Sequence, residues 1–514
     1  MHRIVIIKKS NELKSVLLNC ENAIHSSTKM ILGITAQNHD ASLALIDGDQ
    51  IVWAAHAERY SRVKNDNLLS ADMLADMRLY GEPTQLVWFE RPLQKDLRRL
   101  FSGQRPWHVS PSDQLHAVGL DHLPIDYVGH HQSHASAGYY TSPYEDASIL
   151  VVDAIGEWDT VSIWEARKDK MVCRWRKKYP NSFGLFYTAM TQWMGLKPNE
   201  EEYILMGMAA HGTPRYVDEL RETFFSSWSP PDFKLRHNLH RGCSWWEPCD
   251  SSASKFDIAA SVQKLAEEYL LETVLVMRSN TTSDNLIFMG GVALNCVANS
   301  IIARSGIFEN IWIMPNPGDS GSAIGAVAAH TQQHLKWAGP YLGTDIKQDV
   351  DIESLVDNLE AGHVVALANG RAEFGPRALG NRSLLCDPRG VDAKPRMNTI
   401  KKREQFRPFA PAVLAEHADT YFDMPVKDSP YMQFVARCRT PDLLPGVCHV
   451  DNTSRVQTVT ERDNPLFRSI LEEWNKRTGC PILMNTSLNI KGEPLVNTWD
   501  DALRFQNLHN IPVY

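Results

Sequence analysis

The sequence lacks any run of about 18 uncharged apolar residues, so no segment is predicted to span a membrane. Its start, MHRIVIIKKS, holds an apolar stretch that is too short and too quickly charged for a signal peptide. Cysteine is scarce as well. Nine cysteines are scattered without C-x-x-C spacing, and Cys243 and Cys249, the closest pair, are expected to be unlinked thiols. These absences predict a reducing, cytoplasmic setting.

Positive charge is also in deficit. The chain has 53 Lys and Arg against 61 Asp and Glu, and the net charge of -8 disfavours non-specific binding to nucleic acid. A local basic groove is still compatible with that total. Hydrophobic residues make up 43% and charged residues 22%, as in an ordinary globular protein, and 514 residues are enough for two or three domains.

The stretch from residue 130 to residue 159 carries the clearest candidate for chemistry. His130 and His134 are four apart in an Ala-rich segment that suits a helix, so their side chains share one face. The segment ASILVVD then predicts a buried strand that ends at Asp153, before a turn at Gly156. Two imidazoles and a carboxylate fit a metal site with nitrogen and oxygen ligands. The alternative is that this common spacing only places two packing or hydrogen-bonding histidines.

Residues 1–29 look detachable from the rest of the chain. From Met30, strand-like runs cover residues 31–35, 42–46 and 50–55, and an Asp-Gly turn joins the last two as a hairpin. A strand, a polar loop and a hairpin are how actin-like ATPase domains begin, and His39 and Asp40 lie in that loop. The plainer interpretation of this pair is a turn held by local hydrogen bonds.

Two further segments predict a strand that runs into a polar turn. Residues 285–295 read as a strand, a turn at Gly290 and Gly291, and a helix start at Asn295. Backbone amides at such a turn approach phosphate or adenosine closely. Residues 311–314 form a strand that leads to Asp319, just beyond the strand end, where α/β sheets place ligand sites.

Basic residues gather in two regions. Residues 91–108 interleave Arg and Lys with Phe101 and Trp107, a pattern that holds phosphates and stacks on bases, although a charged surface helix explains it too. After a predicted linker at 332–350, Gly- and Pro-rich turns carry the cations that a polyanion site requires: Arg371, Arg377, Arg382, Arg389, Lys401, Arg403 and Arg407. Residues 481–487 predict a buried strand ending in Asn485 and Ser487, which suit a small amide or an oxyanion.

Taken together, these stretches resemble the O-carbamoyltransferase family of tobramycin, cephamycin and nodulation-factor biosynthesis. The likeness is carried, in order, by NHDASLAL, GHHQSHASAGYYTSP, MGGVALN, NPGDSGSAIGA, GRAEFGPRALGNRS, REQFRPFAP and MNTSLNIKGEP. It implies an α/β fold. An actin-like (ASKHA, Kae1-like) domain would span residues 30–340 and an α+β, YrdC/Sua5-like domain residues 341–514, with residues 1–29 as an extension. Ile204 departs from the family motif, which has a lysine there.

The resemblance also implies a reaction and its residues. The second domain would make carbamoyl-adenylate from carbamoyl phosphate and ATP with Mg²⁺, and the first would transfer the carbamoyl group to an acceptor hydroxyl. The family's donor and ATP positions fall on Arg377, Lys401, Arg407, Arg455, Asn485 and Ser487. Its metal ligands, for Fe(II) or another divalent ion, fall on His130, His134, Asp153 and Asp319. The nucleotide would lie at Gly156, Gly290, Gly291 and Asn295, and His39 with Asp40 would be catalytic.

The expected acceptor is the 5-hydroxymethyl group of hydroxymethylcytosine in DNA, in the host cytoplasm if the protein is viral. Residues 91–108, Lys177-Lys178 and Trp245-Trp246 motivate this expectation. A hydroxyl on an antibiotic, toxin or sugar is the alternative, and the net charge of -8 favours it. A tRNA-modifying enzyme of the threonylcarbamoyl type, which shares both folds, is the second alternative. Neither a membrane partner nor an obligate protein partner is expected.

Overall fold

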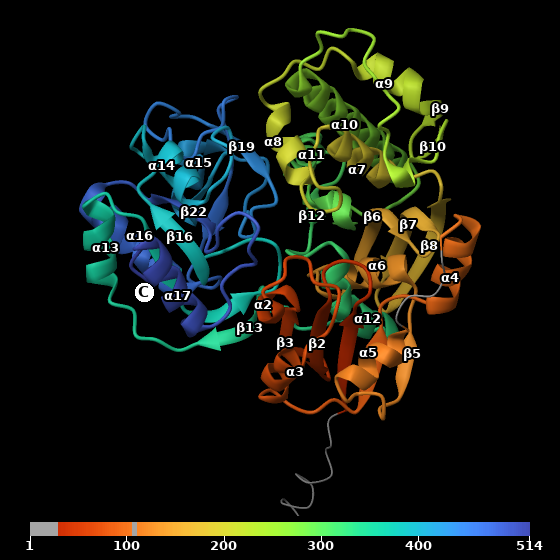
Figure 1. Cartoon of the computed structure of the whole chain (residues 1–514), viewed down its shortest axis with the longest axis horizontal. Coiled ribbons are helices and arrows are strands. Elements are labelled where there is room, and N and C mark those ends of the chain that lie inside the picture. The colour runs from red at the N-terminus through yellow and green to blue at the C-terminus, as the bar shows by residue number, and fades with distance from the viewer. Residues whose placement is uncertain (1–28, 105–109) are drawn as a thin grey trace, which may run out of the picture.

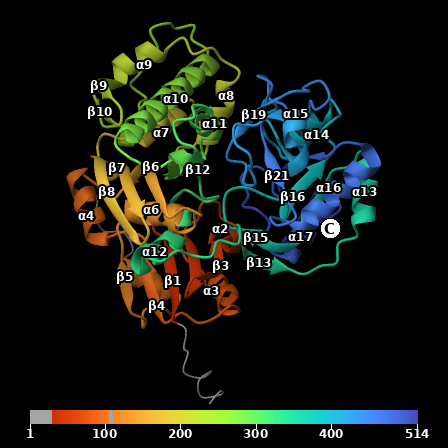
Figure 2. The same cartoon turned by 180° about the vertical axis from the view of Figure 1, so that it is seen from behind.

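The computed structural model of the chain describes residues 29–104 and 110–514. These residues form two lobes that lie side by side (Figures 1 and 2). The first lobe contains two five-stranded sheets, and the second contains one five-stranded sheet with two smaller ones. Residues 1–28 and the positions of Arg105 and Trp107 in the predicted basic run lie outside the described residues.

The first sheet of the first lobe has the strand order β3-β2-β1-β4-β5. Strands β1 to β3 pair antiparallel, whereas β4 is parallel to β1 and β5 is parallel to β4. The predicted strands and their Asp-Gly hairpin are therefore confirmed. The strands are β1 (Met30–Thr35), β2 (Ser42–Asp47), β3 (Gln50–His56), β4 (Gln85–Trp88) and β5 (Ile125–Tyr127).

The second sheet repeats this plan with the order β12-β11-β6-β7-β8. Strands β6 to β8 pair antiparallel, β11 is parallel to β6, and β12 is parallel to β11. A duplicated sheet of this order and direction is the plan of actin-like proteins, and the expected α/β class is confirmed. The strands are β6 (Asp146–Gly156), β7 (Asp159–Arg167), β8 (Lys170–Lys178), β11 (Asn285–Met289) and β12 (Asn310–Trp312).

Two helices lie between these sheets and contact each other: α6 (His130–Tyr140) and α12 (Ser322–Thr331) (Figure 1). Helix α12 packs on β1 and β2, and α6 packs on β6 and β11. A Cβ at Gly325 of α12 would lie 1.9 Å from the carbonyl oxygen of Ser133, so only glycine lets the helices approach this closely. The chemistry-bearing ends of both helices are thereby brought together.

The other helices of this lobe cover the outer faces of the sheets. The longest, α10, begins after Ser254, whose side chain accepts a hydrogen bond from the amide of Phe256. The set is α2 (Glu58–Ser61), α3 (Ala71–Arg78), α4 (Pro92–Phe101), α5 (Pro111–Ala117), α7 (Phe183–Trp193), α8 (Glu202–Ala209), α9 (Val217–Phe224), α10 (Lys255–Ser279) and α11 (Cys296–Arg304), with a hairpin of β9 (Phe225–Ser229) and β10 (Asp232–Leu235).

The second lobe is built on a sheet of order β14-β16-β22-β17-β21, antiparallel except for the β17–β21 pair. Helices α13 (Ile352–Glu360) and α16 (Pro465–Thr478) bury one apolar cluster against it, and α14 (Ala393–Ile400) and α17 (Trp499–His509) contribute to a second. The strands are β14 (Val365–Ala368), β16 (Arg382–Cys386), β17 (Ala410–Leu414), β21 (Gln457–Val459) and β22 (Ile482–Ser487).

Two smaller sheets complete the second lobe. One pairs β13 (Tyr341–Ile346) with β15 (Gly370–Glu373), so part of the predicted linker at 332–350 is a strand. The other contains β18 (Phe422–Asp423), β19 (Val435–Cys438) and β20 (Thr453–Arg455). The lobes are held together by hydrogen bonds such as Arg59 Nη2 to the carbonyl oxygen of Gly375, at 3.0 Å. No helix of the described residues is long and apolar enough to cross a bilayer.

Candidate metal centre and anion site

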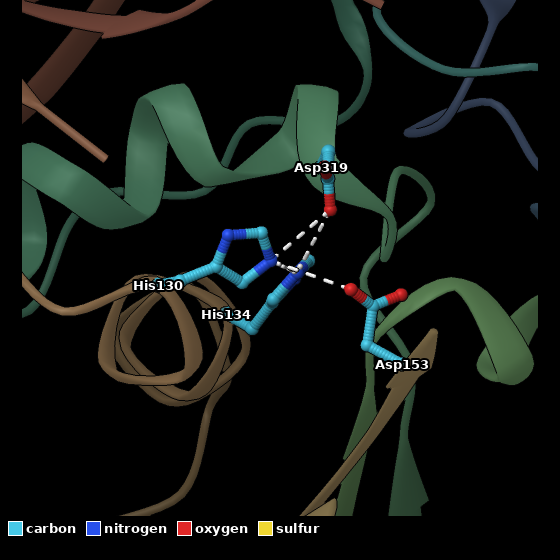
Figure 3. Close-up of side chains that lie close together, drawn as sticks. All are labelled: His130, His134, Asp153 and Asp319. Carbon is cyan, nitrogen blue, oxygen red and sulfur yellow. Dashed lines mark hydrogen bonds and ion pairs between the residues drawn. The ribbon is translucent and has the colours of Figure 1, made fainter. Parts of the chain in front are cut away.

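Four side chains converge between the two sheets of the first lobe (Figure 3). His130 and His134 come from one face of α6, Asp153 from β6, and Asp319 from the 3-10 turn Asp319–Gly321 that precedes α12. One ligand atom from each residue lies within 4.8 Å of all the others. All four residues are buried. The structure thus brings together the four residues that the family resemblance implies as metal ligands.

The distances suit a single cation. Asp319 Oδ1 lies 3.3 Å from Nε2 of both His130 and His134, and Asp153 Oδ2 lies 3.3 Å from Nε2 of His130. The two Nε2 atoms are 3.2 Å apart. Two imidazole nitrogens and two carboxylate oxygens form a donor set that suits iron, manganese or zinc. The residues therefore fit the divalent metal that the family resemblance implies.

The charges of these groups are strongly coupled. Burial lowers the pKa of His130, but Asp319, Asp153 and Glu90 outweigh that effect and hold the pKa well above its usual value. Burial and Asp319 raise the pKa of Asp153, but the hydrogen bond from His130 and the charges of both histidines hold it low. Both carboxylates therefore stay ionised at neutral pH, as metal ligands must be.

Three of the four ligands have a polar neighbour behind them, and two of these neighbours, Glu90 and Ser322, were not predicted from the sequence. Glu90 Oε2 lies 3.7 Å from Nδ1 of His130, and the buried Lys95 forms an ion pair with Glu90. Ser322 Oγ lies 3.2 Å from Nδ1 of His134, and the amide of Gly291 donates to Asp153 Oδ1 at 3.2 Å. Such second partners fix the tautomer and orientation of a metal-bound imidazole.

Glu90→Gln is expected to weaken metal binding by about 10- to 100-fold, because the carboxylate that orients His130 loses its charge. Affinity for Zn²⁺ or Fe²⁺, measured by competition with a chelator, tests this. Glu145→Gln in the loop after α6 serves as a control, because this carboxylate makes no ion pair within the described residues. Unchanged affinity in Glu90→Gln would show that Glu90 supports only Lys95.

His39 and Asp40 lie in the loop between β1 and β2, where His39 Nδ1 is 3.2 Å from Asp40 Oδ2. Burial lowers the pKa of His39, but Asp40, Asp319 and Asp153 together raise it to about 10. Ser42, at the end of this loop, donates to the backbone oxygen of Ser320 at 2.6 Å, so the loop lies beside Asp319 of the metal centre. The His39 side chain is nonetheless 44% exposed, so solvent and a substrate can reach it.

The glycines predicted to hold a nucleotide make close contacts within the fold. A Cβ at Gly156 would lie 2.2 Å from Cδ2 of His130, and one at Gly290, which has φ +90°, would lie 2.2 Å from the carbonyl oxygen of Val152. The Asn295 side chain exchanges hydrogen bonds with Gln263 at 3.1 and 2.9 Å. These contacts give each residue a structural role, and nucleotide binding at this turn stays a prediction.

A cluster of arginines lies where the second lobe meets α8 and α11 of the first. Arg377 and Arg455 are partly buried, and neither forms an ion pair with a carboxylate of the described residues, whereas Arg407 pairs with Glu404 at 3.6 Å. Burial and the charge of Arg455 lower the pKa of Arg377 to about 9. Arg407 belongs to the same cluster and stacks on Tyr203, with its guanidinium 4.9 Å from the ring centroid. Arg403, the fourth member, adds to this repulsion.

Such crowding of cations is costly unless an anion binds among them. The cluster is therefore a candidate polyanion site, and three of its four members were expected at donor-binding positions. Arg403 was singled out only for its place in a basic turn. A small cavity beside the cluster is lined by Arg377, the segment at 431–433, and Ala293, Leu294, Pro315 and Pro317 of the first lobe.

The remaining predicted donor residues meet at the end of β22, where Asn485 and Ser487 belong to the strand and Lys401 follows α14. Lys401 Nζ donates to Ser487 Oγ at 3.0 Å and to Asn489 Oδ1 at 2.7 Å, and burial with nearby arginines holds the pKa of Lys401 well below its usual value. Asn485 Nδ2 donates to Gln457 Oε1 at 2.7 Å, while Asn485 Oδ1 is buried without a hydrogen-bond partner in the described part of the chain.

Three of the predicted cations serve the fold instead. Arg382 is fully buried and donates to backbone carbonyls, among them that of Asn497 at 3.0 and 3.2 Å. Arg371 donates to the carbonyl oxygen of Val52 at 2.8 Å, and Arg389 pairs with Asp387 at 2.8 Å. The density of arginines in the sequence did not distinguish these three from the cluster.

Comparison with known proteins now identifies the family. A family model described as "Carbamoyltransferase N-terminus" matches residues 107–328, and one described as "Carbamoyltransferase C-terminus" matches residues 356–513. The chain belongs to the carbamoyltransferase family. The metal centre lies within the first match, and the arginine cluster lies within the second. His39 and Asp40 precede both matches.

Relatives that match over most of their length support this assignment. A 3'-hydroxymethylcephem-O-carbamoyltransferase of Amycolatopsis lactamdurans is 37% identical over 93% of this carbamoyltransferase and 96% of its own length. The nodulation protein NolNO of Sinorhizobium fredii is 31% identical over 90% of this chain and 76% of its own. An uncharacterised protein of Synechocystis sp. is 34% identical over 92% and 93% of the two chains. The protein is a transferase that requires a carbamoyl donor and a hydroxyl acceptor.

Proposed function

We propose that the protein is an ATP-dependent O-carbamoyltransferase that activates its donor in the second lobe and transfers it in the first. The observation that carries this proposal is the pairing of two sites: a partly buried arginine cluster, and a metal centre built from two histidines and two aspartates. The cavity beside Arg377 is also lined by Pro317, which is two residues from Asp319. The two sites therefore face the same junction between the lobes, consistent with domains at 30–340 and 341–514.

Activation would take place among the arginines. Carbamoyl phosphate loses its phosphate to water and yields carbamate, whose oxygen attacks the α-phosphorus of ATP as pyrophosphate leaves. Arg377, Arg407 and Arg455 would neutralise the phosphates of ATP, which would bind together with Mg²⁺. Lys401 with Ser487 and Asn485 would hold the carbamoyl end, because the free Asn485 Oδ1 can accept a hydrogen bond from an amide. An enclosed path between the two sites would protect the reactive adenylate from water.

Transfer would take place at the metal centre. A divalent ion, iron or another, held by His130, His134, Asp153 and Asp319 would supply Lewis-acid stabilisation of the carbamoyl oxygen or the adenylate phosphate. His39 would take the proton of the acceptor hydroxyl as its oxygen attacks the carbamoyl carbon, the bond from that carbon to the phosphate oxygen breaks and AMP leaves, and Asp40 would orient the ring. Asp153 and Asp319 are two of the carboxylates that raise the pKa of His39. The charge of an ion bound by them would offset this effect and bring the pKa of His39 closer to the range of a general base.

The acceptor we propose is a hydroxyl on a small-molecule natural product. The name of the cephem relative supports this, whereas the expected DNA acceptor finds no support in the names of the relatives described above. The residues that motivated DNA are also used elsewhere: Lys95 and Arg98 point inward, Trp246 is buried, and Lys177 forms an ion pair with Asp232.

The test separates the two half-reactions. Wild-type protein with ATP and carbamoyl phosphate should release pyrophosphate, and addition of a hydroxymethylcephem should give a product heavier by one carbamoyl group. Threonine with bicarbonate in place of carbamoyl phosphate should give neither result. Product from hydroxymethylated DNA but not from the cephem would overturn the proposed acceptor, and pyrophosphate release only with threonine would overturn the donor.

His39→Gln is expected to lower transfer by about 100-fold or more while pyrophosphate release stays normal, because only transfer needs the base. Asp40→Asn removes the carboxylate that most raises the pKa of His39. The rise of the transfer rate with pH should therefore move to lower pH in that variant. A pH profile that is identical in Asp40→Asn and wild type would remove His39 from the role of base.

A further inference from the structure

The loop between α2 and α3, residues 62–70, contacts both the second lobe and the loop that carries His39. Helix α2 lies where the two lobes meet (Figures 1 and 2). At the start of the α2–α3 loop, Arg62 donates hydrogen bonds to the second lobe. Further along, residues 65–67 bind the β1–β2 loop, which contains His39. One short segment of the first lobe thus joins the second lobe to the loop of the proposed base.

The β1–β2 loop is fixed by this segment on both sides of His39. Its backbone amides donate to carbonyl oxygens of the α2–α3 loop in three pairs: Gln37 with Asn67 at 2.9 Å, Asp40 with Asn65 at 3.4 Å, and Ala41 with Asp66 at 2.7 Å. Gln37 and Asp40 also have left-handed φ values of +72° and +57°. Residues other than glycine keep this backbone where the surrounding structure holds them, and they concentrate at functional sites. The position of His39 therefore depends on the α2–α3 loop.

Arg62 fixes the other end of the loop on the second lobe. Its guanidinium donates to the carbonyl oxygens of Leu495 and Pro494 at 2.5 and 3.2 Å. It also lies 4.0 Å from Oδ1 of Asp501, near the start of α17. The backbone of Arg62 is left-handed as well, with φ +60°. A planar guanidinium that binds two successive carbonyls sets direction as well as distance, so this contact orients the loop.

The segment that accepts these hydrogen bonds leads directly to the predicted donor residues. The carbonyl oxygen of Glu493 accepts a hydrogen bond from Nδ2 of Asn489 at 2.6 Å. Oδ1 of Asn489 in turn accepts from Lys401 Nζ and from Ser487 Oγ, each at 2.7 Å. These residues bind one another without Arg62. A continuous set of contacts therefore runs from Lys401 and Ser487, through Arg62, to the loop of His39.

We propose that Arg62 is a positioning residue for carbamoyl transfer. By binding the segment at 493–495, it holds the α2–α3 loop in place, and that loop holds His39 where it can take the proton of the acceptor hydroxyl. The inference rests on the proposed function, in which His39 is the base. Arg62 touches neither the acceptor nor the donor in this role. Displacement of a reacting group by about 1 Å costs up to about 100-fold in rate, so loss of Arg62 should slow transfer strongly.

Arg304 is a matched control for simple adhesion between the lobes. This residue of α11 lies 3.1 Å from Asp423 of β18, so it also forms a charged contact between the first and the second lobe. Within the described residues, the contacts of its guanidinium are with Asp423 and not with the β1–β2 loop or the segment at 493–495. Arg62→Met and Arg304→Met each remove one arginine from the junction, and only the first should slow transfer.

Kinetics of the full-length protein with ATP, carbamoyl phosphate and a hydroxymethylcephem test the proposal. Arg62→Met is expected to lower kcat for transfer by about 10- to 100-fold, while KM for the acceptor and pyrophosphate release without acceptor stay near the wild-type values. Arg62→Lys, which can still donate to one carbonyl, should give an intermediate rate. In a His39→Gln background, Arg62→Met should cause no further loss, because Arg62 acts through His39. Arg304→Met should transfer as wild type does.

A second measurement does not require the proposed function. The His39 side chain is 44% exposed, so diethyl pyrocarbonate can modify it, and mass analysis of peptides resolves it from the other histidines. Modification of His39 should be about threefold faster or more in Arg62→Met, because a loop that has lost this contact opens more often. The rate should be unchanged in Arg304→Met.

Wild-type transfer or wild-type modification of His39 in Arg62→Met would overturn the proposal. An equal loss of transfer in Arg304→Met would assign Arg62 to lobe adhesion, loss of pyrophosphate release would assign it to the donor site, and losses that multiply in the double variant would separate it from His39. If wild type neither releases pyrophosphate nor forms product, the proposed function fails, and modification of His39 alone then decides whether Arg62 positions it. Thermal unfolding checks the fold of each variant, and Arg62→Lys carries the same tests if the methionine variant is unstable.

Discussion

Asp319→Asn is expected to abolish carbamoyl transfer while pyrophosphate release from ATP and carbamoyl phosphate continues. Asp319 Oδ1 is the carboxylate atom that lies 3.3 Å from both histidine nitrogens, so it joins the two halves of the ligand set. Asparagine keeps the shape of the side chain and removes its charge. Because changes to mere supporting groups already cost about 10- to 100-fold in metal affinity, loss of this ligand should cost more than 100-fold.

Metal content after loading and desalting, together with both half-reactions, measures this outcome. Asp284→Asn is a matched control, since Asp284 is an exposed acid that pairs with Arg278 far from the site. Full metal content and normal transfer in Asp319→Asn would refute the metal centre. Loss of pyrophosphate release as well would place the metal in donor activation, and the division of labour between the lobes would have to be reversed.

Much of this site was predictable because its signals are local. A four-residue spacing puts His130 and His134 on one helical face wherever a helix forms, and an apolar, β-branched run ending in Asp153 predicts a strand with an acid at its end. The Asp-Gly turn after β2 fixes a hairpin for the same reason. What joined Asp319 to this set was the family resemblance, because the close contact of α6 and α12 depends on residues far apart in sequence.

The parts that were missed depend on partners that are distant in sequence. Glu90 stands just after the buried strand β4, as Asp153 stands just after the buried part of β6. This shared pattern, an acid at the end of an apolar strand, could have identified Glu90 as a candidate site residue. Its partner Lys95 is buried on the inner face of α4, where the hydrophobic pattern of a helix predicts apolar residues. That pattern therefore predicted the wrong buried face and hid the Glu90–Lys95 pair. Likewise, Arg382 and Arg377 stand five residues apart in similar turns. Only the fold shows that one binds backbone carbonyls and the other faces its fellow arginines.

Arg377→Met is expected to abolish pyrophosphate release and, in the absence of ligands, to raise the melting temperature by a few degrees. Burial and the neighbouring Arg455 and Arg407 lower the pKa of Arg377 to about 9, so the folded protein disfavours this cation. Methionine fills a similar space without charge, and relief of such repulsion typically stabilises a fold by about 1 kcal/mol or more. Stability and activity should therefore change in opposite directions.

A matched control and a ligand titration complete this test. Arg437→Met, at an exposed position of β19 in the same lobe, should change neither property. ATP should raise the melting temperature of wild type, since a ligand that binds only the folded state stabilises it, and should raise that of Arg377→Met far less. A variant that still releases pyrophosphate would remove Arg377 from the donor site. One that loses stability without ligand would mean that the fold already compensates the charge of Arg377, and an anion would no longer be needed to explain the cluster.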